Sequence, residues 1–231
     1  MSSLALPFLK ARLVSKTKEY DQVVTYRLKP EKPLQFVAGQ YAHVLLPGMP
    51  SRDRVRELSF ASSPGEDEVM LTVDLASGSA FKQQLDSLKP GEFLQLFKIK
   101  GEFTLPEVDQ QIVFISGGIG LTPVQALLHE ITATGRDMQP VIVHVATGDF
   151  LYKKELEALP YEQHRIRRVE VEPTLSLITK QNPEALYYVS GSPSFIEAID
   201  GQLDMNGIGE RQVKHDTFKG YKEGARDDDS I

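Results

Sequence analysis

The stretch Ser116-Gly117-Gly118-Ile119-Gly120-Leu121-Thr122-Pro123 decides the fold, because it links an apolar run to a helical pattern through three glycines. The apolar run, Gln111 to Ser116, predicts a short buried strand. The helical pattern extends roughly from Pro123 to Thr134, and proline suits a first helical turn, where its missing N–H costs nothing. We therefore predict a strand–turn–helix junction, with Thr122 as the cap of the helix.

A glycine-rich helix start is suited to a phosphate group. Glycines let backbone amides approach a diphosphate without a Cβ in the way, and the helix start carries about half a positive unit charge. The alternative is a purely structural turn in a parallel sheet. Three glycines followed by Thr122-Pro123 favour nucleotide binding, although Pro123 stands where the pattern G-x-G-x-x-G has its third glycine.

The chain that follows this junction alternates between strand and helix patterns. The predicted strands are Val141–Val145, Ile166–Val171, Leu186–Ser190 and Gln212–His215. The predicted helices are Tyr152–Leu159, Leu175–Lys180 and Ser194–Met205. Alternating βα units predict a parallel sheet that is covered on both faces.

The chain that precedes the junction has a different pattern. From about Phe8 to Thr104, short β-rich runs are separated by Pro/Gly turns, which predicts an antiparallel sheet or barrel. One helix is expected there, capped by Ser79, with Phe81, Leu85 and Leu88 on one face. The predicted fold is therefore α+β with two domains: an antiparallel β-barrel over residues 1–105, then a doubly wound α/β domain with a C-terminal tail over 106–231.

Composition excludes several classes of function. The 231 residues carry a formal net charge of -6, which argues against a protein that coats nucleic acid. No apolar run reaches the ~18 residues of a membrane span, and the N-terminal residues do not predict a secretory signal, so we expect a cytoplasmic protein. Cysteine is absent, and the five histidines form no metal-binding pair, so neither a metal centre nor a cysteine nucleophile is predicted.

Three further segments could hold an anionic or aromatic ligand. Arg56 to Pro64 offers an arginine for a phosphate and serines for a ring nitrogen. Ser77 to Lys82 opens the predicted helix of the first half, and Tyr188 to Pro193 forms another strand–glycine–helix junction. Taken singly, each segment is equally consistent with a structural turn or a solvated strand.

The ordered set of these segments resembles the ferredoxin–NADP reductase family. The resemblance spans about Phe8 to Tyr221 and includes the phrases Phe36-Val-Ala-Gly-Gln-Tyr, Leu88-Lys-Pro-Gly-Glu, Lys100-Gly-Glu-Phe-Thr-Leu-Pro and Asp216-Thr-Phe-Lys-Gly-Tyr. It implies an FAD-dependent oxidoreductase that transfers hydride between NADH or NADPH and FAD. It also implies that electrons pass on to a ferredoxin, a flavodoxin or another acceptor, which the sequence does not identify.

The resemblance implies roles for individual positions. On the flavin side, Arg56 would contact the FAD diphosphate, and Ser59 would be the catalytic residue near flavin N5. Contacts with FAD are also implied for Leu58, Phe60, Ser77, Gly78, Ser79, Ala80 and Phe81. The nicotinamide dinucleotide would be received by Gly117, Gly118, Gly120, Thr122 and Pro123, with Gly191, Ser192 and Pro193 beside its nicotinamide half. Phe218 or Tyr221 would cover a flavin face.

Three departures from the family pattern bear on function. Leu58 replaces an aromatic residue, which should loosen the hold on the flavin ring, since an aromatic pair is worth ~0.5–1.5 kcal/mol beyond area burial. Ser190 replaces a cysteine that many relatives carry. Ala146 to Asp149 offers no arginine for a 2′-phosphate, and Asp149 would repel one, so NADH is favoured over NADPH, with Lys153 and Lys154 as nearby cations.

Two other functions stay open at this point. A flavin- or nucleotide-binding module without turnover, such as an electron-transfer subunit or redox sensor, is favoured by Leu58 and Ser190. An α/β enzyme that binds another nucleotide, such as a methyltransferase, would leave the segments at Arg56 and Ser77 unexplained. The sequence does not determine the oligomeric state.

Overall fold

The computed structural model describes residues 8–50 and 53–218 of the chain. The chain folds into two compact units, one that ends at Glu102 and one that begins at Phe103. We call them the N-terminal and C-terminal units and describe each by itself. Within the described residues, no helix has both the length and the apolar character needed to cross a membrane.

The N-terminal unit is a six-stranded antiparallel sheet with the strand order β4-β3-β6-β1-β2-β5. Its elements are β1 (Leu9–Tyr20), β2 (Val23–Pro30), β3 (Tyr41–Leu45), β4 (Val55–Ser59), β5 (Val69–Asp74), α1 (Ala80–Ser87) and β6 (Phe93–Lys100). The two edge strands meet through a bridge between Phe60 and Leu71, and Ala61 N–H donates to the Met70 carbonyl at 2.9 Å. The sheet is therefore closed into a barrel, which satisfies the backbone groups of its edges.

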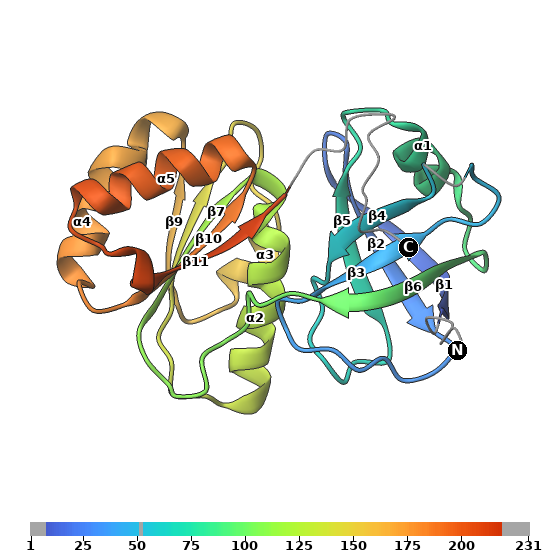
Figure 1. Cartoon of the computed structure of the whole chain (residues 1–231), viewed down its shortest axis with the longest axis horizontal. Coiled ribbons are helices and arrows are strands. Elements are labelled where there is room, and N and C mark those ends of the chain that lie inside the picture. Colours follow the sequence, from blue (N-terminus) through green and yellow to red (C-terminus); the bar gives the residue numbers. More distant parts are fainter. Residues whose placement is uncertain (1–7, 51–52, 219–231) are drawn as a thin grey trace, which may run out of the picture. The chain divides into compact units, whose positions relative to one another are not determined.

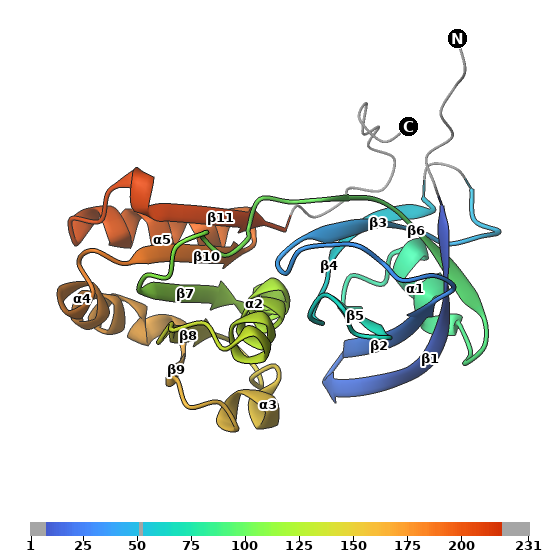
Figure 2. The same cartoon turned by 90° about the horizontal axis from the view of Figure 1, so that it is seen from below.

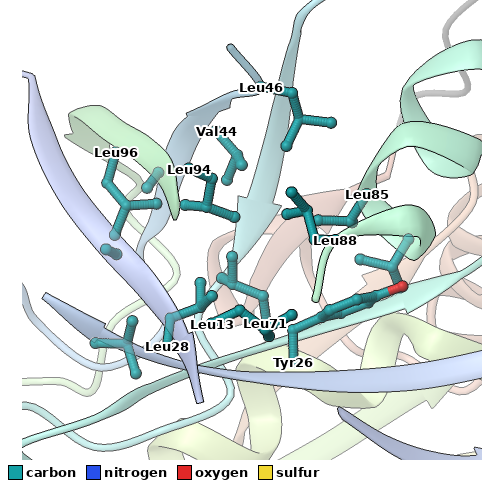
Figure 3. Packing of buried hydrophobic residues seen from close by; sticks show 14 of the residues in the cluster. Leu13, Tyr26, Leu28, Val44, Leu46, Leu71, Leu85, Leu88, Leu94 and Leu96 are labelled. Atoms are coloured by element: carbon teal, nitrogen blue, oxygen red, sulfur yellow. The ribbon is translucent and has the colours of Figure 1, made fainter. Parts of the chain in front are cut away.

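The core of the barrel holds alternate side chains of its strands together with one face of α1 (Figure 3). Leu94 and Leu96 of β6 and Tyr26 and Leu28 of β2 are at most 1% exposed. As predicted, Phe81, Leu85 and Leu88 lie on one face and join this core. The buried face of α1 fixes the helix against the barrel, so the position of its first turn is set by packing.

The C-terminal unit is a five-stranded parallel sheet with the order β11-β10-β7-β8-β9 (Figure 2). Its strands are β7 (Ile112–Gly117), β8 (Val141–Val145), β9 (Glu162–Ile166), β10 (Leu186–Gly191) and β11 (Val213–Thr217). Its helices are α2 (Leu121–Thr134), α3 (Lys153–Glu157), α4 (Val171–Gln181) and α5 (Pro193–Met205), and the 3₁₀ turns are η1 (Gly118–Gly120), η2 (Arg168–Glu170) and η3 (Glu210–Gln212).

Helices cover both faces of this sheet (Figure 1). On one face, α4 and α5 pack Leu175, Ile178 and Ile199 against Val113 and Ile115 of β7. On the other face lies α2, whose residues from Leu121 to Leu128 are all buried. Buried strands of this kind read as continuous apolar runs, which is why β7, β8 and β10 are visible in the sequence.

The order of the strands places a topological switch point between β7 and β10. From β7 the chain proceeds to β8 on one side, and it later returns to β10 on the other side. Open α/β sheets bind ligands outside the carboxyl ends of the strands at such a point. In this unit the carboxyl end of β7 carries Gly117 to Gly120, and the carboxyl end of β10 carries Gly191.

The predicted fold class is confirmed, with one strand misplaced. Residues Ile166 to Val171 do not form a strand; the strand is β9, which ends at Ile166, and the following residues enter η2 and α4. The β-branched side chain of Val169 suggested a strand, yet it is 88% exposed. The polar segment Glu162–Ile166 pairs at the sheet edge, where only one neighbour exists and an apolar pattern is not required.

Candidate functional site

The first turn of α1 is the candidate anion site of the N-terminal unit. Gly78, with φ +60° and open space around it, turns the chain into the helix, and Ser77, Gly78 and Ala80 are exposed. Ser79 is the N-cap as predicted, but within the described residues its side chain makes no capping hydrogen bond, and the first turn holds no acidic residue. The first N–H groups of the helix therefore stay available to an anionic ligand.

Two cationic side chains converge beside this turn. The Arg56 guanidinium lies over the Phe81 ring at 5.3 Å from its centroid, and its Nη1 donates to the Val55 carbonyl at 2.6 Å. Burial lowers the pKa of Lys82, the positive charge of Arg56 lowers it further, and Asp74 opposes both effects. Repulsion between two cations is relieved when an anion binds between them, so this arrangement fits a phosphate group.

Lys82 ends the segment Ser77 to Lys82 that the sequence analysis singles out, but no role was predicted for it. A groove of about 600 Å³ begins at the same place and runs between α1 and the β1–β2 hairpin. Its walls include Gly78, Lys82, Val24 and Leu75. The groove also carries both charges, with Lys16 and Lys18 beside Asp21 and Asp86.

The other predicted flavin contacts lie on or beside β4. Ser59 is 9% exposed and pairs with Tyr41 of β3, while Leu58 is half-buried and packs against the barrel core. Phe60 is 0% exposed, and its side chain belongs to the core. Its side chain closes the barrel beside the Phe36 ring, at a centroid distance of 4.3 Å, and offers no surface to a ligand.

In the C-terminal unit, some glycines of the turn Gly117 to Gly120 are required by close packing against β10 and α5. A Cβ on Gly120 would lie 2.3 Å from the Ser190 carbonyl oxygen, and a Cβ on Gly117 or Gly191 would come within 2.8 Å of the Phe195 ring. Gly118 differs, since it has φ +52° and open space around it. Gly120, Thr122 and Pro123 are buried, so the partly exposed surface of the turn is formed by Gly117, Gly118 and Ile119.

Side chains from three elements hold the carbonyl groups of this turn. His144 Nε2 of β8 lies 3.0 Å from the Gly118 oxygen, Thr122 Oγ1 of α2 donates to Ile119 at 2.8 Å, and Ser190 Oγ of β10 donates to Gly120 at 2.7 Å. The prediction that Thr122 caps the helix is wrong, because α2 begins at Leu121 and Gly120 is its N-cap. The hydroxyl of Thr122 is a donor to the preceding turn rather than an acceptor.

Ser190 takes the place of a cysteine in the family pattern, and its surroundings show what the hydroxyl does. The residue is 0% exposed, and its bond to the Gly120 carbonyl joins β10 to the glycine turn. His144, which the site predictions omitted, is also 0% exposed. The signal that could have found it is a histidine within an otherwise apolar strand that ends at the same edge as the glycine turn.

The structure brings an arginine to the loop that follows β8, where the sequence offered none nearby. No arginine stands near Asp149 in the sequence, but Arg167 at the end of β9 reaches this loop. Its Nη1 donates to the Ala146 carbonyl at 3.0 Å and to the Gly148 carbonyl, and its guanidinium lies 4.6 Å from the centroid of the Phe150 ring. The adjacent parallel strands bring together residues that are separated in the chain.

At the end of β10, the predicted residues lie together. Ser192 caps α5, since its hydroxyl accepts from Phe195 N–H at 3.2 Å, and Pro193 opens the helix. Phe218 N–H donates to the Gly191 carbonyl at 2.8 Å, which places Phe218 directly after β11 beside this junction. Tyr221 lies outside the described residues. The junction therefore groups Gly191, Ser192, Pro193 and Phe218 at the switch point.

Comparison with known proteins agrees with this geometry. No family model matches the chain. A flavohemoprotein of Bacillus subtilis is 25% identical over 92% of this chain and 59% of its own length. The reductase component of propane 2-monooxygenase from Mycolicibacterium goodii is 28% identical over 85% of this chain and 63% of its own length. The chain thus spans about three fifths of the length of these curated relatives.

Solved structures share the fold. The FAD/NAD-binding domain of nitric oxide dioxygenase from Vibrio cholerae has a TM-score of 0.73 at 19% identity, covering 91% of this chain and 98% of that one. Ferredoxin–NADP⁺ reductase from Plasmodium falciparum has a TM-score of 0.74 at 16% identity, covering 91% and 96%. The predicted two-domain fold, which the sequence shares with the ferredoxin–NADP reductases, is therefore confirmed.

The packing of the glycine turn can be tested with one pair of variants. Gly120→Ala should lower the stability of the protein by ~1–3 kcal/mol, because its methyl group would meet the Ser190 backbone oxygen. Gly201→Ala, at an exposed position of α5 with nothing within 4 Å, should raise stability by ~0.5–1 kcal/mol. Urea-induced unfolding followed by circular dichroism measures both. Equal shifts of the two midpoints would contradict the close approach of β10 to the turn.

Proposed function

We propose that this chain is an FAD-dependent NAD(P)H oxidoreductase, with FAD held by residues 1–105 and the nicotinamide dinucleotide by residues 106–231. The observation that carries the proposal is a helix start suited to a diphosphate in each unit, at Gly78 to Ala80 and at Gly117 to Ile119. The likeness to an oxygenase reductase component and to an FAD/NAD-binding domain supports it. FAD, when bound, would accept hydride and release electrons singly or in pairs.

On the flavin side, the chain contributes charge and backbone donors. Arg56 and Lys82 would neutralise the diphosphate, and the exposed N–H groups after Gly78 would donate to its oxygens. Ser59 would sit near flavin N5 as a hydrogen-bonding group. Leu58 packs on the barrel core and offers an aliphatic surface to the ring. Phe60 has no part in this proposal, since it is fully buried.

On the nicotinamide side, the chain contributes a rigid turn at the switch point. Gly117, Gly118 and Ile119 would face the diphosphate, while Gly191 to Pro193 and Phe218 would lie toward the nicotinamide. Binding and orientation are what a protein supplies to hydride transfer, and no acid–base side chain is required. This agrees with a site built from glycines, serines and backbone groups.

The electron acceptor is proposed to be another protein or small carrier, such as a ferredoxin or a flavodoxin. One relative is itself named as the reductase component of a monooxygenase, which supports a separate acceptor. A cytosolic location is proposed on the sequence alone. Nothing in the chain identifies the particular acceptor, and an anaerobic pull-down with the reduced protein is the experiment that would find it.

A binding module without turnover is the second candidate. Leu58 favours it, because the chain lacks the aromatic residue that many family members place against the flavin ring. Such a module would bind FAD but would not have its flavin reduced by NADH or NADPH. Anaerobic reduction of the flavin by NADH or NADPH therefore separates the two candidates.

We expect the purified protein to be yellow and to contain FAD in stoichiometric amount. The measurement is the visible absorption spectrum, followed by release of the cofactor and chromatography against FAD and FMN standards. A colourless preparation that fails to take up added FAD would overturn the proposal. FMN in place of FAD would contradict the assignment of a dinucleotide site.

We expect NADH to bleach the flavin anaerobically faster than NADPH does. Asp149 opposes a 2′-phosphate, and Nη1 of the nearby Arg167 already donates to two backbone carbonyls. Stopped-flow absorbance with each coenzyme gives the two rates. A preference for NADPH would contradict this expectation, and loss of that preference in Arg167→Ala would then identify Arg167, rather than Lys153 or Lys154, as the partner of the 2′-phosphate.

Arg56→Ala should weaken FAD binding roughly tenfold to a hundredfold, since a charge-assisted hydrogen bond is worth ~1.5–3 kcal/mol. The control is Arg54→Ala, which removes the same charge two residues earlier and should leave the affinity near that of the wild type. Equilibrium titration of the apoprotein with FAD, followed by fluorescence, measures both constants. Equal losses in the two variants would mean that only net charge matters and that Arg56 is not in the site.

A further inference from the structure

The glycine turn contains one peptide group that packing does not fix. Gly120 is held against β10, where a Cβ would lie 2.3 Å from the Ser190 oxygen. Gly118 has open space around it and φ +52°, in the region that glycine enters at little cost. Its carbonyl direction therefore depends on hydrogen bonds. The structure gives that oxygen two partners, the Leu121 N–H and the His144 side chain.

His144 reaches this carbonyl from the neighbouring strand and is held in place itself. It lies on β8, its Nε2 is 3.0 Å from the Gly118 oxygen, and the Phe150 ring meets it edge-on at a centroid distance of 5.6 Å. Because a carbonyl only accepts, Nε2 must carry the proton. Nδ1 has no hydrogen-bond partner among the described residues. The imidazole therefore has a single polar contact, and that contact is with the glycine turn.

The surroundings keep the imidazole neutral. Burial lowers the pKa of His144 to about 4; the hydrogen bond to the Gly118 backbone opposes this effect, and the positive charge of Arg165 on β9 adds a smaller lowering. Arg167 lies over the Phe150 ring, which itself contacts the imidazole of His144. Near neutral pH the imidazole is therefore neutral, with its proton on Nε2. Its hydrogen bond to the Gly118 carbonyl does not change with pH in this range.

The direction of one carbonyl sets the direction of the next N–H. In a trans peptide the C=O of one residue and the N–H of the following residue point in opposite directions. When His144 draws the Gly118 carbonyl toward β8, the Ile119 N–H points away from β8. Ile119 belongs to the first turn of the helical segment, where N–H groups have no intrahelical partner.

We propose that His144 is a positioning residue for dinucleotide binding, which fixes the Gly118–Ile119 peptide so that the Ile119 N–H donates to the diphosphate. This inference rests on the proposed binding of a nicotinamide dinucleotide by the C-terminal unit. His144 itself does not touch the ligand. Its contribution is to preorganise the Gly118–Ile119 peptide in the orientation that the ligand needs. Binding then does not have to supply the free energy of ordering this peptide, so the affinity is higher.

The test uses the full chain with His144→Leu, which removes the donor at similar volume, and His144→Gln, whose amide can replace Nε2 as a donor. The probe is ADP-ribose, which carries the diphosphate without the nicotinamide, titrated calorimetrically. We expect His144→Leu to raise Kd roughly fivefold to tenfold, as for the loss of one neutral hydrogen bond, and His144→Gln to stay within about twofold of the wild type. The control is Thr179→Val, which removes a buried hydroxyl that donates to the Leu175 carbonyl within α4, away from the glycine turn, and should leave Kd near that of the wild type.

Steady-state kinetics with NADH and an artificial acceptor gives a second readout. In His144→Leu the KM for NADH should rise by a similar factor, while kcat changes less than twofold, because the reacting rings are unaffected. If His144→Leu does not fold, His144→Asn replaces it, since its shorter amide does not reach the carbonyl.

The outcomes separate this inference from the proposed function. If the wild type binds ADP-ribose and His144→Leu binds it equally well, the positioning role is wrong. Equal weakening in the Leu and Gln variants would also overturn it, since a purely structural role has no need of a donor. If the wild type binds neither ADP-ribose nor NADH, the proposed function itself fails, whatever the variants do.

Discussion

The structure depends on one constraint: the backbone N–H groups at the starts of α1 and of the η1–α2 segment have no intrahelical partners and need other hydrogen-bond partners. Each start must be exposed enough to meet a ligand, yet each must belong to a helix that is fixed by packing. In the N-terminal unit the buried face of α1 provides the fixing, through Phe81 and Leu85. In the C-terminal unit α2 is buried along most of its length. In the proposed function, a ligand would therefore meet preformed donors in both units.

The two helix starts complement an anion by different means. The start of α1 has two cations beside it, Arg56 and Lys82, and burial is the main cause of the lowered pKa of Lys82, with Asp74 opposing it and Arg56 adding a smaller lowering. The start at η1 has neutral neighbours, and its carbonyls are held by His144, Thr122 and Ser190. The first site would gain affinity from charge, which salt screens. The second would gain it from the orientation of peptide groups, which salt affects much less.

Much of this could be predicted because local pattern and global fold agree. The apolar runs of β7, β8 and β10 and the glycines after β7 predict the parallel sheet and the place where a ligand enters. The prediction failed at Ile166 to Val171, where β-branched residues stood at a surface turn. At Phe60, barrel closure places the ring in the core, which its place in a motif did not indicate.

By itself, the sequence determined the two-unit architecture, the glycine turn and the order of the motifs, because these depend on residues that are neighbours in the chain. Only the tertiary structure decided which side chains complete the sites. His144 meets Gly118 because β8 pairs with β7, and Arg167 meets the loop at Ala146 because β9 pairs with β8. Such contacts join residues about 20 or more positions apart, and strand pairing, which no local pattern encodes, brings them together.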